Sequence, residues 1–240
     1  PVKGDFRSGR EFVKAVDGVS FEVRRGEVFG IVGESGCGKS TILSMLAGQL
    51  APSEGSIYIG GTIGYMLQKD YLLQWRSIRS NALLGLEIQK KLTPENIAYV
   101  DTLLTQYGLG DFKNSLPNQL SGGMRQRAAL IRTLAVRPDI LLLDEPFSAL
   151  DYQTRLSVSD EIGTIIREEG KTAILVTHDI SEAISLSDRV VVLSKRPASL
   201  KKIFPIQFST KNHTPMQARE APEFKDYFNA IWKELDVHVS

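Results

Sequence analysis

Short apolar runs alternate along the chain with longer stretches that have helical spacing. The runs lie at Val28–Val32, Ile57–Ile59, Ile63–Met66, Ile140–Leu143, Ala173–Val176 and Val190–Leu193. Strand-like runs that alternate with helices are typical of βαβ units around a mainly parallel sheet. The pattern predicts an α/β fold. Since no internal repeat or low-complexity tract divides the sequence, we expect residues 1–240 to form a single domain.

Two parts of the chain depart from this alternation. Residues 78–137 are expected to form a helical subdomain, with a helix at Pro94–Tyr107 that Thr93 caps and Gly108 ends. Residues 205–240 form a carboxyl-terminal extension. Apolar residues recur there at helical spacing and predict an amphipathic helix that packs on the body of the protein: Phe224, Tyr227, Phe228, Ile231, Trp232 and Leu235.

Composition and charge exclude several classes of protein. The 240 residues carry 29 Lys and Arg against 28 Asp and Glu, so no strong positive field favours nucleic acid or an anionic membrane. No apolar run approaches the roughly 20 residues that a membrane-spanning helix requires. With a single cysteine, Cys37, and no leader-like start, the sequence predicts a protein of the reducing cytoplasm.

A glycine-rich segment between a predicted strand and a predicted helix has the pattern of a phosphate-binding loop. Glycines allow successive backbone N–H groups and the following helix dipole to point at phosphates. We expect Lys39 to reach the β- and γ-phosphates and Ser40 to bind magnesium. The whole loop consists of Gly33, Glu34, Ser35, Gly36, Cys37, Gly38, Lys39, Ser40 and Thr41.

Two further apolar runs end in polar residues that suit hydrolysis. Ile140–Leu143 is followed by Asp144 and Glu145, and buried parallel strands deliver such acids to the carboxyl edge of the sheet. Asp144 is expected to hold magnesium, directly or through water, and Glu145 to act as general base. His178 follows Ala173–Val176 and should emerge at the same edge, where it could hold the γ-phosphate and the attacking water in line.

A second anion site is indicated at Ser121, Gly122 and Gly123, which directly precede a long predicted helix. One nucleotide has one set of phosphates. The second site is therefore expected to cover a nucleotide that another copy of the protein binds.

These motifs, in this order, resemble those of the ATP-binding subunit of ABC transporters over nearly the whole chain. The resemblance implies a P-loop ATPase with a mainly parallel sheet, an antiparallel β portion and a helical subdomain that carries the signature. It identifies Gly33–Thr41 as Walker A, Gln68 as the Q-loop residue, Leu120–Arg125 as the signature, Asp144–Glu145 as Walker B, Ser148–Asp151 as the D-loop and His178 as the switch histidine.

The same resemblance implies ATP and Mg²⁺ as ligands and a dimer in which two subunits enclose two ATP molecules head to tail. Ser121 and Gly123 would contact the ATP of the opposite subunit, and Asp151 would lie at the dimer interface. Gln68 would touch magnesium or the attacking water, and a membrane permease would dock near it. The signature departs from the commonest pattern at Met124, where the usual residue is Gln.

The type of transporter is indicated differently by the two ends of the chain. Gly64–Asp70, Trp75 and Met124 are similar to importers of nitrate, sulfonate and taurine, which implies a solute-binding protein and a place on the cytoplasmic face of the membrane. Pro1–Phe21 instead resembles oligopeptide importers, and a natural mosaic, an engineered chimera or a further subfamily would each explain the difference. The chain starts without Met, where relatives would have completed a first strand and an adenine-stacking aromatic, a role that Phe6 or Phe12 could take.

The alternatives to a transport ATPase are a soluble ABC ATPase and a nucleotide-binding module without catalysis. A soluble ABC ATPase that acts on nucleic acid or ribosomes often has a long coiled-coil insertion, whereas only 81 residues separate Lys39 from Ser121 here. A nucleotide-binding module without catalysis would not need a general base, yet Glu145 and His178 are both present.

Overall fold

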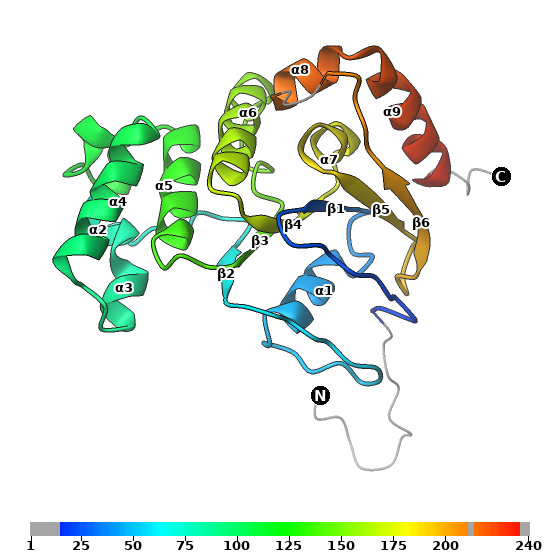
Figure 1. The fold of residues 1–240 in the computed structure, drawn as a ribbon, viewed down its shortest axis with the longest axis horizontal. Coiled ribbons are helices and arrows are strands. Elements are labelled where there is room, and N and C mark those ends of the chain that lie inside the picture. Colours follow the sequence, from blue (N-terminus) through cyan, green and yellow to red (C-terminus); the bar gives the residue numbers. More distant parts are fainter. Residues whose placement is uncertain (1–14, 211–213, 236–240) are drawn as a thin grey trace.

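The computed structural model describes residues 15–210 and 214–235, which form six strands and several helices (Figure 1). The strands are β1 (Val28–Val32), β2 (Ile63–Met66), β3 (Ile140–Asp144), β4 (Thr172–Thr177), β5 (Arg189–Leu193) and β6 (Leu200–Pro205). The α-helices are α1 (Lys39–Leu46), α2 (Ile78–Ala82), α3 (Leu84–Ile88), α4 (Pro94–Gln106), α5 (Gly122–Leu134), α6 (Tyr152–Glu168), α7 (Ile180–Leu186), α8 (Pro215–Glu220) and α9 (Pro222–Leu235). Two 3₁₀ turns, η1 (Gly110–Phe112) and η2 (Pro117–Gln119), lie between α4 and α5.

The sheet has the order β2-β3-β4-β1-β5-β6, in which the first five strands are parallel and β6 is antiparallel to β5. Five of the six predicted strands are confirmed, β1 and β2 with the bounds expected from the sequence. The antiparallel portion is this β5–β6 pair. β6 was not predicted, because its half-exposed sequence LKKIFP contains two lysines and lacks an apolar run.

The predicted strand at Ile57–Ile59 is wrong, since the segment has no regular structure. Tyr58 is 94% exposed and Ile57 is also exposed, so the burial that stabilises β-branched and aromatic residues in strands is missing. Gly55, with a φ of 83°, and the pair Gly60–Gly61 flank the run. A strand of three residues with such flexible ends and no buried face gains too little free energy from packing to form.

Helices cover both faces of the sheet (Figure 1). On one face, Ile42 and Leu43 of α1 pack in a cluster with Phe29 and Ile31 of β1. On the other face, α6 and α7 cover the strands, and α9 follows the outer side of α7. β1 and β4 are buried along their whole lengths, which explains why their sequences are continuous apolar runs.

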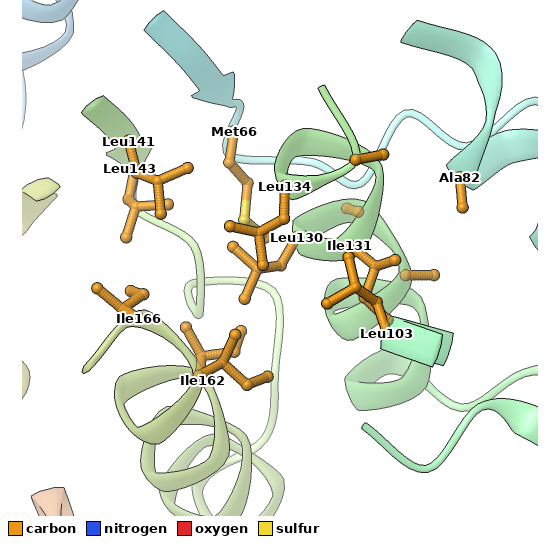
Figure 2. Close-up of a cluster of buried hydrophobic side chains, with 14 of the residues drawn as sticks. Met66, Ala82, Leu103, Leu130, Ile131, Leu134, Leu141, Leu143, Ile162 and Ile166 are labelled. Atoms are coloured by element: carbon orange, nitrogen blue, oxygen red, sulfur yellow. The ribbon is translucent and has the colours of Figure 1, made fainter. Parts of the chain in front are cut away.

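The core continues from the sheet into the helices of the 78–137 region (Figure 2). Met66, at the end of β2, points toward Leu130 and Leu134 of α5, and Leu103 of α4 lies on the far side of α5. Ile162 of α6 belongs to the same buried cluster. The helices α2 to α5 are therefore joined to the sheet by one continuous apolar core.

The helices predicted in the 78–137 region and in the carboxyl-terminal extension are present. α4 covers Pro94–Gln106, the hydroxyl of Thr93 accepts a hydrogen bond from the N–H of Asn96 at 3.2 Å, and Gly108 follows with a φ of 72°. α9 buries Ile231 against the body of the protein, as its spacing predicts, whereas Trp232, which the prediction placed on the same face, is 53% exposed. Within 15–210 and 214–235, no helix has the length and hydropathy needed to cross a bilayer.

Candidate nucleotide-binding and hydrolytic site

The loop between β1 and α1 wraps around the ammonium group of Lys39. The Nζ of Lys39 donates hydrogen bonds to the carbonyl oxygens of Gly33, at 2.7 Å, and Glu34, at 2.9 Å, and the residue is only 4% exposed. Gly38 has a φ of 118°, and a Cβ there would lie 2.6 Å from the carbonyl oxygen of Ala15. The loop therefore requires glycine at this position for two reasons, conformation and space.

Cys37 points into the protein rather than toward a ligand. It is 2% exposed and belongs to the core under α1. A Cβ on Gly33 would lie 2.8 Å from its Sγ, so the loop is packed tightly over the thiol. Cys37 thus fills space beneath the loop, while Glu34, Ser35, Gly36 and Ser40 are exposed on the outer side.

Asp144 joins the end of β3 to the start of α1. Its Oδ1 accepts a hydrogen bond from Ser40 Oγ at 3.1 Å, and its Oδ2 accepts one from the hydroxyl of Tyr65 at 3.3 Å. Burial raises the pKa of Asp144, and the nearby Glu145 carboxylate adds to this, although the two hydrogen bonds oppose it. Burial and Asp144 together raise the pKa of Tyr65 to about 12, so Tyr65 stays a donor.

Glu145 turns away from Asp144 toward a second set of partners. Its φ of 44° lies in the left-handed region, and its N–H donates to the carbonyl oxygen of Val176 at 2.8 Å. Its Oε2 lies 3.2 Å from Nδ1 of His178 and 3.3 Å from Nε2 of Gln68. This sharp turn directs the carboxylate of Asp144 toward Ser40 and the adjacent carboxylate of Glu145 toward His178.

Gln68 and Ser148 complete this second cluster. Nε2 of Gln68 also donates to Oγ of Ser148 at 3.2 Å, and Ser148 Oγ donates to the carbonyl oxygen of Glu145 at 3.0 Å. Side chains from the segments that follow β2, β3 and β4 thus converge at the carboxyl edge of the sheet. Glu145 and His178 therefore lie at the same edge of the sheet, and Gln68 lies beside them.

Ser121 and the two glycines of the signature lie at the start of α5, which packs beside α4 and α6 rather than near α1 (Figure 1). The exposed Ser121 caps the helix, accepting a hydrogen bond from the N–H of Met124 at 3.3 Å. A Cβ on Gly123 would lie 2.6 Å from Cγ2 of Val158, and one on Gly122 would lie 3.0 Å from Cδ2 of Leu150. Gly123 therefore also permits α5 to approach α6 closely, and Gly122 permits a close approach to the segment before α6.

Asp151 occupies an equivalent position on α6. Its side chain is exposed and accepts a hydrogen bond from the N–H of Thr154 at 3.1 Å. Hydrogen bonds to Thr154 lower the pKa of Asp151. Ser121 and Asp151 are both distant from Lys39 in the sequence, and both are exposed on the surface of the protein.

Several residues that no sequence pattern indicated connect these motifs. Arg125 of α5 contacts Asp70, two residues after Gln68, at 3.1 Å, and also donates to the carbonyl oxygen of Leu120 at 2.7 Å. Arg132 donates to the carbonyl oxygens of Asp70 and Tyr71 at 2.6 and 2.8 Å. The loop that follows Gln68 is therefore tied to the signature helix. Tyr65 was missed as well, and its hydroxyl in an otherwise apolar strand was the available signal.

Comparison with known proteins agrees with this geometry. The family model described as "ABC transporter" matches residues 16–148. The chain is 48% identical over 235 residues to an uncharacterized ABC transporter ATP-binding protein, YtlC, of Bacillus subtilis, covering 95% of this chain and 90% of that one. It is 40% identical over 205 residues to the taurine import ATP-binding protein TauB of Jannaschia sp., covering 82% and 76%.

Among solved structures, the dimeric ATP-binding cassette MJ0796 in a post-hydrolysis state bound to ADP and Pi is similar, with a TM-score of 0.70 and 29% identity. The match covers 84% of this chain and 95% of that chain. Phe6 and Phe12, and residues 1–14 of the oligopeptide-like stretch, lie outside the described residues. The phosphate loop, the paired acids and the matches over nearly the full chain lead to one conclusion: the chain belongs to the ABC transporter family and is an ATP-binding cassette that hydrolyses ATP.

Proposed function

We propose that the protein is the ATP-hydrolysing subunit of an ABC importer for a small solute of the nitrate, sulfonate or taurine type. The observation that carries the proposal is the cluster at the strand ends, where Glu145 contacts both His178 and Gln68. A protein that only binds nucleotide has no use for a carboxylate that is held beside a histidine and a glutamine. The similarity to taurine import proteins supports the solute class.

These contacts support the following roles. Gly33–Thr41 bind the phosphates, with Lys39 against the β- and γ-phosphates. Glu145 is the general base, which orients and polarises the attacking water, and His178 and Gln68 hold the water and the γ-phosphate in line. Hydrolysis is thus a matter of positioning and charge, which suits a site made of fixed side chains at one sheet edge.

Magnesium fits the donor set that surrounds Ser40. A buried carboxylate of raised pKa and a hydroxyl are hard oxygen donors, which Mg²⁺ prefers, and Asp144 and Ser40 already lie within hydrogen-bonding distance of one another. We infer that Ser40, Asp144 and Gln68 hold it. When bound, the ion neutralises charge that develops on the phosphates.

We infer a head-to-tail dimer, in which Ser121, Gly122, Gly123 and Asp151 of one copy contact the ATP of the other. Ser121 and Asp151 support this because both are exposed at the start of a helix, where they are accessible to a second copy. The similar cassette MJ0796 is dimeric by its description. ATP closes such a dimer and hydrolysis reopens it.

A permease is inferred to dock beside Gln68, on the cytoplasmic face of the membrane, and a solute-binding protein to deliver the solute. Large apolar side chains are exposed around this loop, with Trp75 76% exposed and Leu67 and Tyr71 also exposed. A soluble protein seldom leaves several such residues together without a partner. The tie from Asp70 to Arg125 offers a direct route from this surface to the signature helix.

The ATPase roles are tested with Lys39→Ala, Glu145→Gln and the exposed control Glu54→Gln. Lys39→Ala is expected to lose ATP binding and turnover. Glu145→Gln should bind ATP as the wild type does, lose turnover and shift from monomer to dimer on addition of Mg-ATP, measured by solution mass. Equal loss of ATP binding in Lys39→Ala and Glu145→Gln would refute this division of roles.

The transport role is tested in proteoliposomes that contain the permease. Uptake of labelled taurine, an alkanesulfonate and nitrate is compared with uptake of an oligopeptide, with wild type and Gln68→Ala. We expect uptake of one small anion or zwitterion, and a larger loss of uptake than of ATP binding in Gln68→Ala. Uptake of the oligopeptide would refute the proposed solute class. ATP turnover that is stimulated by nucleic acid instead of by the permease would refute the importer function.

A further inference from the structure

A buried carboxylate lies one helical turn after His178, outside the hydrolytic cluster. Glu182 of α7 is 3% exposed, and its Oε2 accepts a hydrogen bond from the hydroxyl of Thr177 at 2.6 Å. The same hydroxyl accepts from the N–H of Asp179 at 3.0 Å. Asp179 in turn accepts from the N–H groups of Ser181 and Glu182. Residues on both sides of His178 are thus fixed relative to Glu182.

Arg155 of α6 connects this network to the segment before Asp151. Its Nη2 donates to the carbonyl oxygen of Leu150 at 3.0 Å. Its Nη1 lies 3.6 Å from Oδ2 of Asp179, and its Nε lies 3.9 Å from Oε1 of Glu182. One guanidinium therefore spans the inferred dimer-contact segment and the segment that carries His178.

The carboxyl-terminal extension carries a second cation, Arg219, on α8, which packs against α7, the helix of Glu182. α8 is held on α6 by a hydrogen bond from the N–H of Met216 to Oδ1 of Asp160 at 2.7 Å. The approach is close, since a Cβ on Gly163 would lie 2.6 Å from Cγ of Pro215. Arg219 of α8 has a buried Nη2 without a hydrogen-bond partner.

The charged groups that act on Glu182 lie on α6, on α8 and in the segment between β4 and α7. Burial raises the pKa of Glu182 to about 7; the hydrogen bond from Thr177 opposes this, Asp179 adds to it, and Arg155 and Arg219 oppose it. The charge state of this carboxylate therefore depends in part on where α8 holds Arg219.

We propose that Glu182 is a positioning residue for ATP hydrolysis, and that Arg219 links the carboxyl-terminal extension to the placement of His178 through it. The inference rests on the proposed role of His178. Any event that moves α8 on α6 then alters turnover without touching the nucleotide.

The test measures kcat and KM for Mg-ATP against pH in Glu182→Gln, Arg219→Met, the double variant and the exposed α9 control Lys225→Met. We expect Glu182→Gln to lower kcat about tenfold with KM within about twofold, since misplacing a group that acts on the reacting atoms affects turnover more than binding. Arg219→Met should move the acidic limb of kcat to higher pH, because removal of a cation favours the protonated carboxyl. Arg219→Lys keeps the positive charge and should return the acidic limb of kcat to its wild-type pH.

When Glu182 is already replaced by Gln, Arg219→Met should cause no further change in kcat or in its pH dependence. Additive losses, or an Arg219→Met profile identical to that of Lys225→Met, would overturn the link. His178→Ala separates the two levels of inference. If it hydrolyses ATP at the wild-type rate, the proposed role of His178 fails; if it is inactive while Glu182→Gln is fully active, only the positioning inference fails. Gly163→Ala, which displaces α8 without changing a charge, should reproduce a loss of kcat if α8 has this role.

Discussion

The buried Glu182 makes a quantitative prediction about stability. Its pKa is raised from the usual 4.5 to about 7, so the folded protein holds a proton that the unfolded chain has lost. A group of this kind contributes stability that is complete below 4.5 and disappears as the pH rises through about 7. At about 1.4 kcal/mol for each factor of ten in proton affinity, the full loss is about 3 kcal/mol. Glu182→Gln removes this pH-dependent contribution to stability.

The free energy of unfolding of wild type and Glu182→Gln is measured by urea titration at intervals from pH 5 to pH 9. Arg155 and Arg219 keep their charges over this range, so their altered contacts offset the curves without changing their relative slope. The difference between the two proteins should move in favour of the variant by about 2–3 kcal/mol from pH 5 to pH 9. Glu220→Gln, an exposed position on α8, is the matched control. Parallel curves for wild type and Glu182→Gln would refute the reasoning.

Three further outcomes are expected. Glu27→Gln breaks a buried pair with Arg189, where burial alone would raise the pKa of Glu27 but the hydrogen bond from Arg189 lowers it. It should cost about 3 kcal/mol at pH 7 by urea unfolding, and the cost should shrink as the pH falls through the lowered pKa. Gly123→Ala should lower apo stability by about 1–3 kcal/mol by calorimetry because of the contact with Val158, and Val158→Ala should restore it; a wild-type midpoint would contradict this close packing. Tyr65→Phe removes a hydrogen bond to Asp144 and should weaken Mg²⁺ binding in the presence of ATP a few-fold, measured by metal titration. An unchanged Mg²⁺ affinity would argue against this role of Tyr65.

The sequence predicts the parts of the site that local pattern controls. The glycines and Lys39 specify the loop, and apolar runs that end in Asp144, Glu145 and His178 place these side chains at one edge, because parallel strands end together. The contacts between distant segments are different. Asp70 and Arg125 are 55 positions apart, and no periodicity relates them. The same holds for Arg155 and Glu182, which meet only because α6 and α7 pack together.

The errors in the fold have a similar origin. Ile57–Ile59 has the composition of a strand, but its side chains are exposed. β6 has two lysines and still pairs, because β5 offers it a full antiparallel edge with Val190 opposite Phe204. Pairing partners and burial decide such short segments, and neither is contained in the segment itself.

The single thiol of the chain lies beneath the phosphate loop, where tight packing shields it. A maleimide can reach Cys37 only when that loop lifts from the core, so its labelling rate reports the local opening equilibrium of the nucleotide site. Bound nucleotide should slow the reaction by its stabilisation of the closed loop. Cysteines introduced elsewhere for spectroscopic probes can then be modified selectively, with the native residue left in place.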